Sequence, residues 1–432
     1  MARRWVDPFS AALALRDDPG LVLLESMPGF GHLARRSFLA SRPENVATGG
    51  LDAFERAEGW QAGWLSYDLG RAIETLPELA RDQFALPPVA LGTYRSYLEF
   101  DHARRAVHVR GDGDAGHLLA ALDSAKIGIP HHRPLRSWVS SHSRHAYEAA
   151  VRRTIHYIRA GDVFQVNLAQ CLSTEWSGDP FALYGRLRVT SPGPFMALVR
   201  LGGADVISAS PERFLRRRGR LLETRPIKGT RPRGRTSRED RRLAAALKES
   251  EKDRAENVMI VDLARNDLGR VAEYGSVQVR RLCALERHPG VHHLVSVVES
   301  EVAAEVATAD IVRACFPPGS VTGAPKIRAM EIIEELEPVR RGVYCGSVGW
   351  IDPSGDLEMS VAIRTFVASR GRLSLHVGGA IVADSDPALE WQETMHKGAR
   401  LLEAAGGELH GTVSRRRPRT EAGRRQTGLV PS

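Results

Sequence analysis

Residues 164–172 read FQVNLAQCL, in which apolar and polar side chains largely alternate, the period expected of a β-strand with two unlike faces. Three more stretches of strand character follow, at 195–201, 204–209 and 213–222. Strands and helical stretches do not alternate regularly along the chain. The pattern therefore predicts an α+β fold built on antiparallel sheet, and argues against a doubly wound parallel sheet.

Two long helical stretches each carry a pair of acidic residues. One helix is predicted over 238–263 and the other over 387–405, where Asp386 is placed to cap the N-terminus. A further helix is predicted over 143–160, with Ser143 as its N-cap. Further strands are predicted at 344–350, 360–367 and 376–383.

A Pro- and His-rich link, IPHHRP at 129–134, is the predicted boundary between two parts of the chain. Residues 1–128 are expected to form an N-terminal lobe, and residues 135–410 a larger region that carries the chemistry. Within the lobe, the expected elements are strands at 21–24 and 60–67, a hairpin at 94–100 and 106–109, and a helix at 118–126.

The last segment, 411–432, explains most of the charge of the chain. The chain has 432 residues and a formal net charge of +8, and six Arg against one Glu give this tail a net charge of +5. Residues 1–410 therefore carry a net charge of +3, close to neutral for their length. A basic tail of this composition is expected to be disordered. Nucleic-acid binding through the tail is a less favoured alternative function.

The composition is that of a soluble globular protein, with 43% hydrophobic and 26% charged residues. No apolar run of about 18 residues predicts a membrane helix, and the N-terminus MARRWVD lacks the apolar core of a secretory signal. The four cysteines are far apart and form no C-x-x-C, which argues against a disulfide framework and a zinc site. We therefore expect a reduced, cytoplasmic protein.

A candidate nucleophile lies in the segment 223–231, which reads ETRPIKGTR with Lys228 near its centre. Permanently charged guanidinium groups close to an amine lower the pKa of that amine, and burial lowers it further, which makes the amine a usable nucleophile. The alternative is an exposed lysine in a basic loop. The arginines that surround it in sequence are Arg225, Arg231, Arg233 and Arg235.

Two pairs of carboxylates suggest a divalent metal. Asp253 and Glu256 are three residues apart in one predicted helix, so they share a helix face. Glu390 and Glu393 have the same spacing in the other. Four carboxylates brought together from two helices would form the oxygen-rich site that Mg²⁺ prefers. The alternative is that each pair is a solvated helix face.

Other polar features suggest an anionic ligand. Arg364 is flanked by apolar residues, and a buried arginine needs a carboxylate partner, either from the protein or from a substrate. The segment 315–326, CFPPGSVTGAPK, offers a turn and a helix N-terminus to an anion, although its spacing is not that of a P-loop. His292 and His293 lie in an apolar run, where a histidine is more often a core residue than a catalyst.

Together these motifs resemble those of the chorismate-utilising enzymes, which include anthranilate synthase component I, aminodeoxychorismate synthase component I, isochorismate synthase and salicylate synthase. The resemblance extends from about Tyr147 to Leu402 and is weaker in the first lobe. It implies the fold of anthranilate synthase component I, in which large antiparallel sheets form a sandwich flanked by helices. The blocks that carry it include AGDVFQVNLAQ, ISASPERFL, ETRPIKGTRPRGR, KDRAENVMIVDLARNDLGRVA, VHHLVS, CFPPGSVTGAPK, YCGSVGWI, AIRT and GGAIVADSDPALEWQET.

The resemblance also implies roles for the acidic residues. Glu256 and Glu393 are expected to bind Mg²⁺ directly. Asp253 and Glu390 match acids that support the metal through water, although Asp253 is one methylene shorter than the Glu of some members. Glu212, in SPE, is expected to be the general acid.

Further roles implied by the resemblance concern the substrate and the first lobe. His293 matches a histidine beside the substrate ring. In LLES, Glu25 and Ser26 match a site at which some members hold tryptophan, with plain core as the alternative. The residues expected to line the substrate pocket are Thr230, Tyr344, Arg364, Gly378 and Lys397.

Lys228 distinguishes members of the family. Anthranilate synthases carry a small residue at its position, whereas aminodeoxychorismate synthases usually read PIKGT, as here, and use the lysine as a covalent nucleophile. The resemblance thus implies amination of chorismate to 4-amino-4-deoxychorismate for the synthesis of 4-aminobenzoate and folate, with anthranilate synthesis as the alternative. A glutaminase needs an activated cysteine, which we do not recognise here. Ammonia is therefore expected from a separate glutamine amidotransferase subunit. A non-catalytic, regulatory relative is the remaining alternative.

Overall fold

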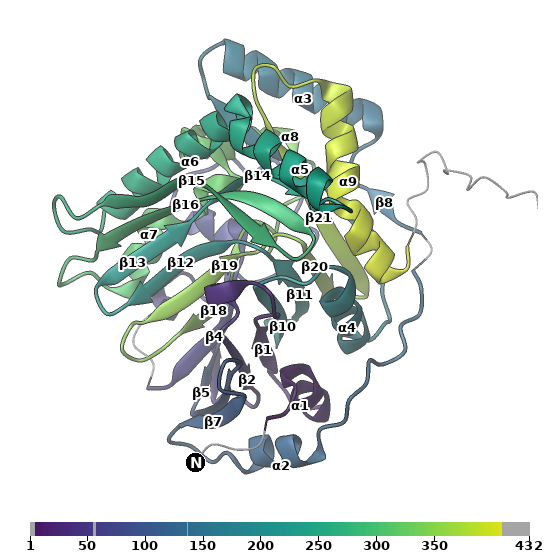
Figure 1. The fold of residues 1–432 in the computed structure, drawn as a ribbon, viewed down its shortest axis with the longest axis vertical. Helices are drawn as coiled ribbons and strands as arrows, with labels where there is room; N and C mark the ends of the chain where they lie inside the picture. The colour runs from purple at the N-terminus through teal and green to yellow at the C-terminus, as the bar shows by residue number, and fades with distance from the viewer. Residues whose placement is uncertain (1–4, 55–57, 136, 408–432) are drawn as a thin grey trace, which may run out of the picture.

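The computed structural model describes residues 5–54, 58–135 and 137–407. Within these residues two large antiparallel sheets pack face to face, and helices cover them on the outside (Figure 1). Strand residues from both sheets, among them Trp64, Val199 and Val348, share one buried apolar core. The predicted α+β sandwich is confirmed. The basic tail at 411–432 lies outside the described residues.

The first sheet has eleven strands in the described chain, in the order β17–β9–β21–β20–β11–β10–β1–β2–β6–β7, with β8 paired to β9. The strands are β1 (Val22–Glu25), β2 (Arg36–Ala40), β6 (Ser96–Asp101), β7 (Ala106–Gly111), β8 (Val139–Ser140), β9 (Gln165–Glu175), β10 (Phe195–Leu201), β11 (Ala204–Ser210), β17 (Gly323–Ala324), β20 (Thr365–Ser369) and β21 (Arg372–Ile381).

The second sheet has ten strands in the same described ranges, in the order β14–β16–β13–β12–β19–β18–β4–β5–β3, with β15 paired to β16. The strands are β3 (Asn45–Ala47), β4 (Trp60–Leu65), β5 (Val89–Tyr94), β12 (Arg213–Arg218), β13 (Leu221–Arg225), β14 (Ile227–Pro232), β15 (Gln278–His288), β16 (Val291–Glu301), β18 (Ser347–Ile351) and β19 (Leu357–Val361).

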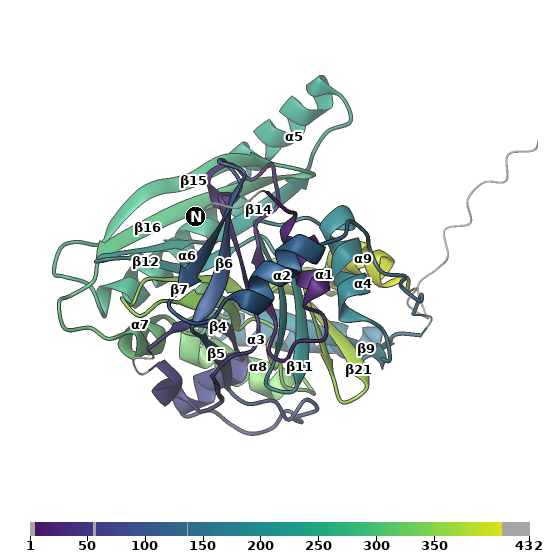
Figure 2. The same cartoon turned by 90° about the horizontal axis from the view of Figure 1, so that it is seen from below.

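Helices α1, α2, α4 and α9 pack on the first sheet through one apolar cluster, and α6 and α7 pack on the second through another. Helix α8 packs against β9 and β17 of the first sheet. Helix α5 projects from the body beside β14 and β15 (Figure 2). The helices are α1 (Pro8–Ala14), α2 (Gly116–Ser124), α3 (Arg144–Arg159), α4 (Pro180–Thr190), α5 (Ser237–Glu249), α6 (Glu251–Gly269), α7 (Thr308–Cys315), α8 (Lys326–Leu336) and α9 (Pro387–Ala405), with short 3₁₀ turns η1 (Gly31–Leu33), η2 (Leu51–Phe54), η3 (Tyr67–Ala72) and η4 (Gly319–Val321).

Both sheets are continuous across the predicted link at 129–134. Strand β1 of the first lobe pairs with β10, and β4 pairs with β18, where Leu65 lies opposite Ser347. The described part of residues 1–128 thus completes both sheets and does not form a sheet of its own. The division of the chain into a lobe and a catalytic region stays a prediction.

The helix predicted over 238–263 is wrong in one respect, because two helices meet at Ser250. The backbone of Ser250 is extended, and its hydroxyl accepts a hydrogen bond from the Asp253 amide at 3.3 Å, so the serine caps a new helix, α6. The break places Asp253 and Glu256 in the first two turns of α6. The helix predicted over 387–405 is confirmed as α9, capped by Asp386.

The strand predicted over 360–367 is also wrong, because the chain leaves the second sheet after β19 and enters the first sheet at β20. Arg364 lies at this crossing with a left-handed backbone, φ 52°. The strand predicted over 344–350 begins later, at Ser347, so Tyr344 lies in the preceding turn. Strand β5 has no counterpart in the sequence prediction.

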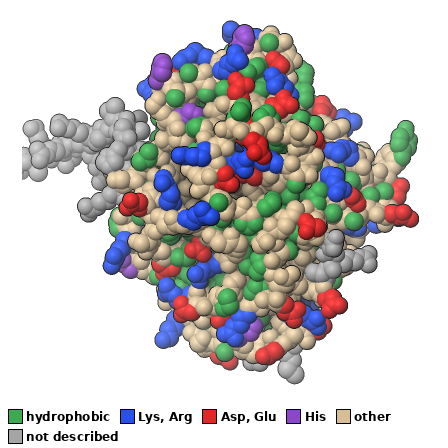
Figure 3. Space-filling model, turned by 180° about the vertical axis from the view of Figure 1, so that it is seen from behind, with side chains coloured by type: hydrophobic (Ala, Val, Ile, Leu, Met, Phe, Trp, Pro, Cys, Tyr) green, Lys and Arg blue, Asp and Glu red, His purple; other side chains and the backbone are tan. Residues whose placement is uncertain are grey.

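The structure bears on the expected absence of membrane helices and of disulfides. None of the described helices is both long and apolar enough to cross a membrane. All four cysteines are buried and free. On the face seen in Figure 3, acidic and basic side chains are interspersed over the described surface.

Candidate active site

Lys228 lies on β14 at a bulge that brings this strand close to α6. Lys228 is opposite Leu294 of β16, and the register shifts before Thr230 pairs with His293. Gly229 supplies the bulge with φ 80°, and a Cβ there would lie only 2.9 Å from Asp253 Cβ of α6. Glycine therefore allows the candidate nucleophile to sit beside the acidic start of α6.

The pKa of Lys228 is lowered, as the sequence predicted; of the two predicted causes, burial acts and the neighbouring arginines do not. Burial lowers the pKa, the carboxylates of Glu256 and Glu212 oppose this, and the ammonium of Lys397 lowers it further. A lowered pKa increases the fraction of the amine that is uncharged and nucleophilic.

Three of the four neighbouring arginines form ion pairs with carboxylates and so do not lower the pKa of Lys228. Arg225 pairs with Glu286 at 2.7 Å. Arg231 pairs with Asp253 at 2.8 Å. The third, Arg233, binds Asp240 of α5 at 2.7 Å, so none of the three guanidinium groups faces the amine unpaired.

Glu212 is the acid on the other side of Lys228. It is only 4% exposed, and burial raises its pKa to about 7, against a hydrogen bond from Ser320 and the charge of Lys228. The Ile227 amide donates to its Oε1 at 3.4 Å. A carboxylic acid with a pKa near 7 keeps its proton in about half of the molecules at neutral pH and releases it readily, as a general acid must.

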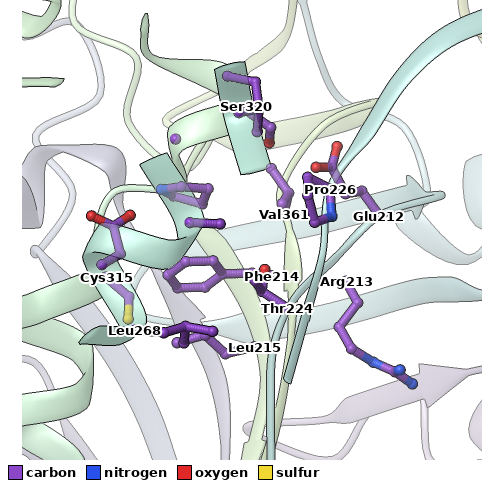
Figure 4. A pocket seen from close by; sticks show the side chains of 15 residues that line it. Glu212, Arg213, Phe214, Leu215, Thr224, Pro226, Leu268, Cys315, Ser320 and Val361 are labelled. Atoms are coloured by element: carbon purple, nitrogen blue, oxygen red, sulfur yellow. The ribbon is translucent and has the colours of Figure 1, made fainter. Parts of the chain in front are cut away.

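Behind Glu212 lies a small cavity of about 30 Å³ between α6 and the second sheet. Figure 4 shows the Glu212 carboxyl group beside Pro226, with Ser320 and Val361 close by. Ser320 comes from η4, within the 315–326 turn. This turn, which the sequence suggested as an anion site, thus contacts Glu212 through Ser320. Lys326, at its end, forms an ion pair with Asp267 at 2.7 Å.

His293 lies on β16, opposite Thr230 of β14. Its Nδ1 and the Thr230 hydroxyl are 3.0 Å apart, and burial together with the charge of Arg364 lowers its pKa to about 3. The imidazole is therefore neutral at physiological pH. His292 is the core residue of the pair, fully buried and bonded through Nε2 to Asp240 at 2.9 Å.

The two acidic helices face each other near Lys228. Burial raises the pKa of Glu256 on α6, and the carboxylate of Glu393 on α9 raises it further. The charge of Lys252 lowers the pKa of both carboxylates. A Cβ on Gly379 would lie 3.2 Å from Glu390 Oε2 and 3.6 Å from Glu393 Oε1, so β21 passes directly under these oxygens. Glu256 and Glu393 therefore influence each other across the two helices, and the metal site predicted from the four carboxylates stays a prediction.

These carboxylates are suited in kind to a hard cation. Glu390 Oε2 is buried without a hydrogen-bond partner in the described chain, an arrangement that calls for a positive ligand. Glu393 is paired with Lys397 at 2.7 Å, and Asp253 with Arg231. Among the described residues, no three Asp, Glu, His or Cys side chains lie close enough together to hold a metal ion.

Arg364 offers its charge to a ligand. Burial and the nearby Arg400 lower its pKa, and no carboxylate of the described residues acts on it. The sequence left open a protein carboxylate or a substrate as the partner of Arg364, and the part of the chain that the structure describes holds no such carboxylate. A buried guanidinium without a partner is costly, and an anionic substrate would relieve it.

The remaining predicted substrate residues lie at different depths. Lys397 donates to the Gly378 carbonyl at 3.0 Å, so these two residues and the carboxylates of α9 form one group. Tyr344 is buried and its ring stacks on His376, with centroids 5.0 Å apart. Its contact with substrate stays a prediction.

Comparison with known proteins agrees with this geometry. The family model described as chorismate binding enzyme matches residues 30–403. The chain belongs to the chorismate binding enzymes. It is 44% identical over 346 residues to aminodeoxychorismate synthase component 1 of Escherichia coli, covering 80% of this chain and 76% of that protein.

Two other members of the family are similar to this chain. Anthranilate synthase component 1 of Thermus thermophilus is 44% identical over 356 residues, covering 80% of this chain and 77% of that protein. The crystal structure of anthranilate synthase component I from Streptococcus pneumoniae superposes with a TM-score of 0.76 at 32% identity, covering 88% of this chain and 93% of that one.

The LLES segment at 23–26 lines a second cavity, of about 350 Å³, between the two sheets. Ser26 donates to the Pro194 carbonyl at 2.9 Å. Glu25 is buried and already paired with Arg188 at 2.8 Å and with the Tyr184 hydroxyl at 2.8 Å. The predicted tryptophan site thus coincides with a cavity, while the charge of Glu25 is balanced inside the protein.

Sequence reasoning missed Ser320 as a contact of Glu212. The segment around it was interpreted as an anion site because its glycines and prolines precede a helix. No local signal shows that η4 packs against the SPE strand, since the two segments are about 100 residues apart in sequence. The fold alone brings them together.

Proposed function

We propose that this chain is an aminodeoxychorismate synthase component 1, which converts chorismate and ammonia to 4-amino-4-deoxychorismate. The observation that carries the proposal is the placement of Lys228 between a protonated acid, Glu212, and the acidic ends of α6 and α9. Relatives with either of two activities are 44% identical to the chain, so identity alone does not separate them. Lys228 supports the first activity, because a covalent adduct with the ring needs an amine at this position.

Lys228 is proposed to add through Nζ to ring carbon 2 of chorismate. The ring double bonds shift and the hydroxyl on carbon 4 leaves. Glu212 gives its proton to this hydroxyl, which departs as water. The product of the step is a secondary ammonium that joins Lys228 to the ring, with Glu212 as carboxylate.

The second step restores both side chains. Ammonia forms a bond to ring carbon 4, the double bonds shift back, and the bond between Nζ and carbon 2 breaks with its electron pair on Lys228. The new ring ammonium returns a proton to Glu212. The pyruvyl arm is retained, so the product is 4-amino-4-deoxychorismate.

Binding of the dianionic substrate is proposed to rest on Arg364 and on a magnesium ion. Arg364 is suited to a bidentate grip on the enolpyruvyl carboxylate, which lysine cannot reproduce. Glu256 and Glu393 would hold Mg²⁺ directly, with Asp253 and Glu390 in support. A bound Mg²⁺ supplies positive charge to the ring carboxylate and polarises the conjugated ring. Lys397 would then be released from Glu393 to face the substrate.

Ammonia is proposed to come from a separate glutamine amidotransferase. The relative from Escherichia coli is named component 1, which implies a second component for that protein. The buried thiols of this chain have raised pKa values at Cys171, Cys315 and Cys345, which is unfavourable for a glutaminase nucleophile. We place the reaction in the reducing cytoplasm, where free buried cysteines are usual.

The proposed function is tested by the identity of the product. The protein is incubated with chorismate, Mg²⁺ and an ammonium salt, and the product is separated by chromatography and identified by mass. 4-Amino-4-deoxychorismate is expected. Anthranilate as the main product would instead establish the alternative activity, and no product from either reaction would support a non-catalytic relative.

A binding role for the first lobe is proposed as well. The 350 Å³ cavity is lined by Ser26, by the aromatic rings of Phe38 and Trp350, and by several arginines, a setting suited to an amino acid with a carboxylate and a large apolar side chain. We propose that it binds tryptophan. Calorimetric titration should show binding that Ser26→Trp, which fills the cavity, abolishes; equal binding by the variant would refute the location.

A further inference from the structure

Arg400 of α9 has no role in the mechanism above, although it lies on the helix face that carries the acidic residues. Residues 390, 393, 397 and 400 are three or four positions apart, so they share one face of α9. Lys397 pairs with Glu393 at 2.7 Å, whereas Arg400 is exposed and takes part in no ion pair within the described chain. This face of the helix therefore ends in a cation whose charge no described carboxylate balances.

The guanidinium group of Arg400 lies at the turn between β15 and β16. A Cβ on Gly290 in this turn would be 3.7 Å from Arg400 Nη1. Three residues along a strand span about 10 Å, and at that distance along β16 His293 is opposite Thr230 of β14. Arg400 therefore reaches from α9 to the outer end of the strand that leads to His293 in the candidate active site.

Arg400 and Arg364 form a pair of like charges. Arg364 is largely buried; burial lowers its pKa and the charge of Arg400 lowers it further, while no carboxylate of the described residues opposes them. The charge of Arg364 acts in turn on His293, whose pKa it lowers in addition to burial. The two guanidinium groups repel each other in the free protein, and an anion bound beside both would remove this repulsion.

A carboxylate of the substrate is the anion that suits this pair. Chorismate is a dianion, and its enolpyruvyl carboxylate is proposed above to bind Arg364. An exposed cation next to a binding site raises the local concentration of an anionic substrate and the rate of its capture. Attraction of this kind needs no fixed geometry, so an ammonium group can supply it at the exposed position. The bidentate grip of Arg364 needs a guanidinium.

We propose that Arg400 is a second substrate-binding cation, which draws the enolpyruvyl carboxylate of chorismate to Arg364 and helps to balance its charge there. This rests on the proposed function, since chorismate is the ligand. Arg400 belongs to binding and not to the steps in which bonds form and break. Its removal should therefore change the KM for chorismate and leave kcat close to the wild-type value.

The first test is the kinetics of Arg400→Gln with chorismate, Mg²⁺ and ammonium chloride. The KM for chorismate should rise about tenfold, while kcat and the KM for ammonium stay unchanged. Arg400→Lys, which keeps the charge, should restore most of the wild-type KM. The matched control is Arg104→Gln, which removes the same charge from an exposed turn between β6 and β7, at the far end of the first sheet from β21. This control should keep the wild-type KM.

Salt gives a measurement that a purely structural role of Arg400 would not change. The Debye length falls from about 30 Å at 0.01 M salt to about 8 Å at 0.15 M. The kcat/KM of the wild-type protein should fall over this range, and that of Arg400→Gln should fall less. Calorimetric titration in a Lys228→Ala background, where no adduct forms, should show that Arg400→Gln weakens the binding of chorismate by the same factor as it raises KM.

A wild-type KM for chorismate in Arg400→Gln would overturn the inference. A raised KM that Arg400→Lys does not lower, together with the wild-type salt dependence in Arg400→Gln, would also overturn it, because Arg400 would then only pack against the turn at Gly290. Failure of the proposed function gives different results. If the wild-type protein binds no chorismate, that function fails, and if it makes anthranilate, the product assignment fails while the role of Arg400 in binding chorismate stands.

Discussion

Replacing the buried acid by its amide, Glu212→Gln, should make the protein more stable and inactive, and the gain in stability should depend on pH. Glu212 is protonated in the folded protein up to a pKa of about 7, whereas its ordinary value is 4.5. Between these two values the unfolded chain has lost the proton and the folded chain keeps it. The stability of the wild-type protein therefore falls as pH rises through this window.

The size of the effect follows from the two pKa values. A tenfold change in an ionisation constant corresponds to about 1.4 kcal/mol. The change from 4.5 to about 7 then costs the wild-type fold about 3 kcal/mol at pH 8, and nothing near pH 4.5. A glutamine has no such cost, and its Oε1 can keep the hydrogen bond from Ile227. The loss of a general acid should lower kcat by about 10²- to 10⁴-fold.

Urea unfolding of both proteins at several pH values between 5 and 8.5 measures the difference in free energy of unfolding. The advantage of Glu212→Gln should grow with pH and level off above about 7. A control is Glu223→Gln, which weakens the pairs of a buried carboxylate with Arg213 and Arg216 and should destabilise the fold throughout. A difference that does not change with pH, or a variant with the wild-type rate, would refute the assignment of Glu212.

Three further predictions concern binding and stability. Arg364→Met should raise the KM for chorismate at least about tenfold, and Arg364→Lys should not restore it, because a bidentate grip needs a guanidinium; recovery by lysine would argue against this contact. Calorimetry should show that Glu256→Gln and Glu393→Gln lose Mg²⁺ binding without unfolding, and unchanged binding in either would remove that residue from the ligand set. Arg188→Ala should cost about 3–5 kcal/mol in urea unfolding, since it leaves Glu25 buried and unpaired, and a loss below about 1 kcal/mol would contradict a structural role for the pair.

The sequence was informative about the acids because helical spacing is a local property. Asp253 with Glu256 and Glu390 with Glu393 could be paired from their three-residue spacing, and the structure places α6 and α9 so that Glu393 acts on Glu256. The break at Ser250 was missed, because a serine is tolerated inside a helix and caps one only where the backbone turns. That turn is set by packing, which local pattern does not report.

The environment of Lys228 shows where sequence reasoning fails. Four arginines close in sequence suggested a repulsive field, but β-strand and helix geometry sends three of them to Glu286, Asp253 and Asp240. The lowered pKa comes from burial, which was predicted, and from Lys397, which is 169 residues away in sequence and was not. Charge pairing across the fold cannot be deduced from composition within a segment.

The direct test of the central claim is the mass of the intact protein after incubation with chorismate and Mg²⁺ in the absence of ammonia. If Lys228 is the nucleophile, the protein should gain the mass of chorismate less one water, the adduct should map to the peptide that contains Lys228, and Lys228→Ala should show neither the adduct nor the ammonia-dependent reaction. An unmodified wild-type protein, together with an undiminished ammonia-dependent rate in Lys228→Ala, would contradict the account.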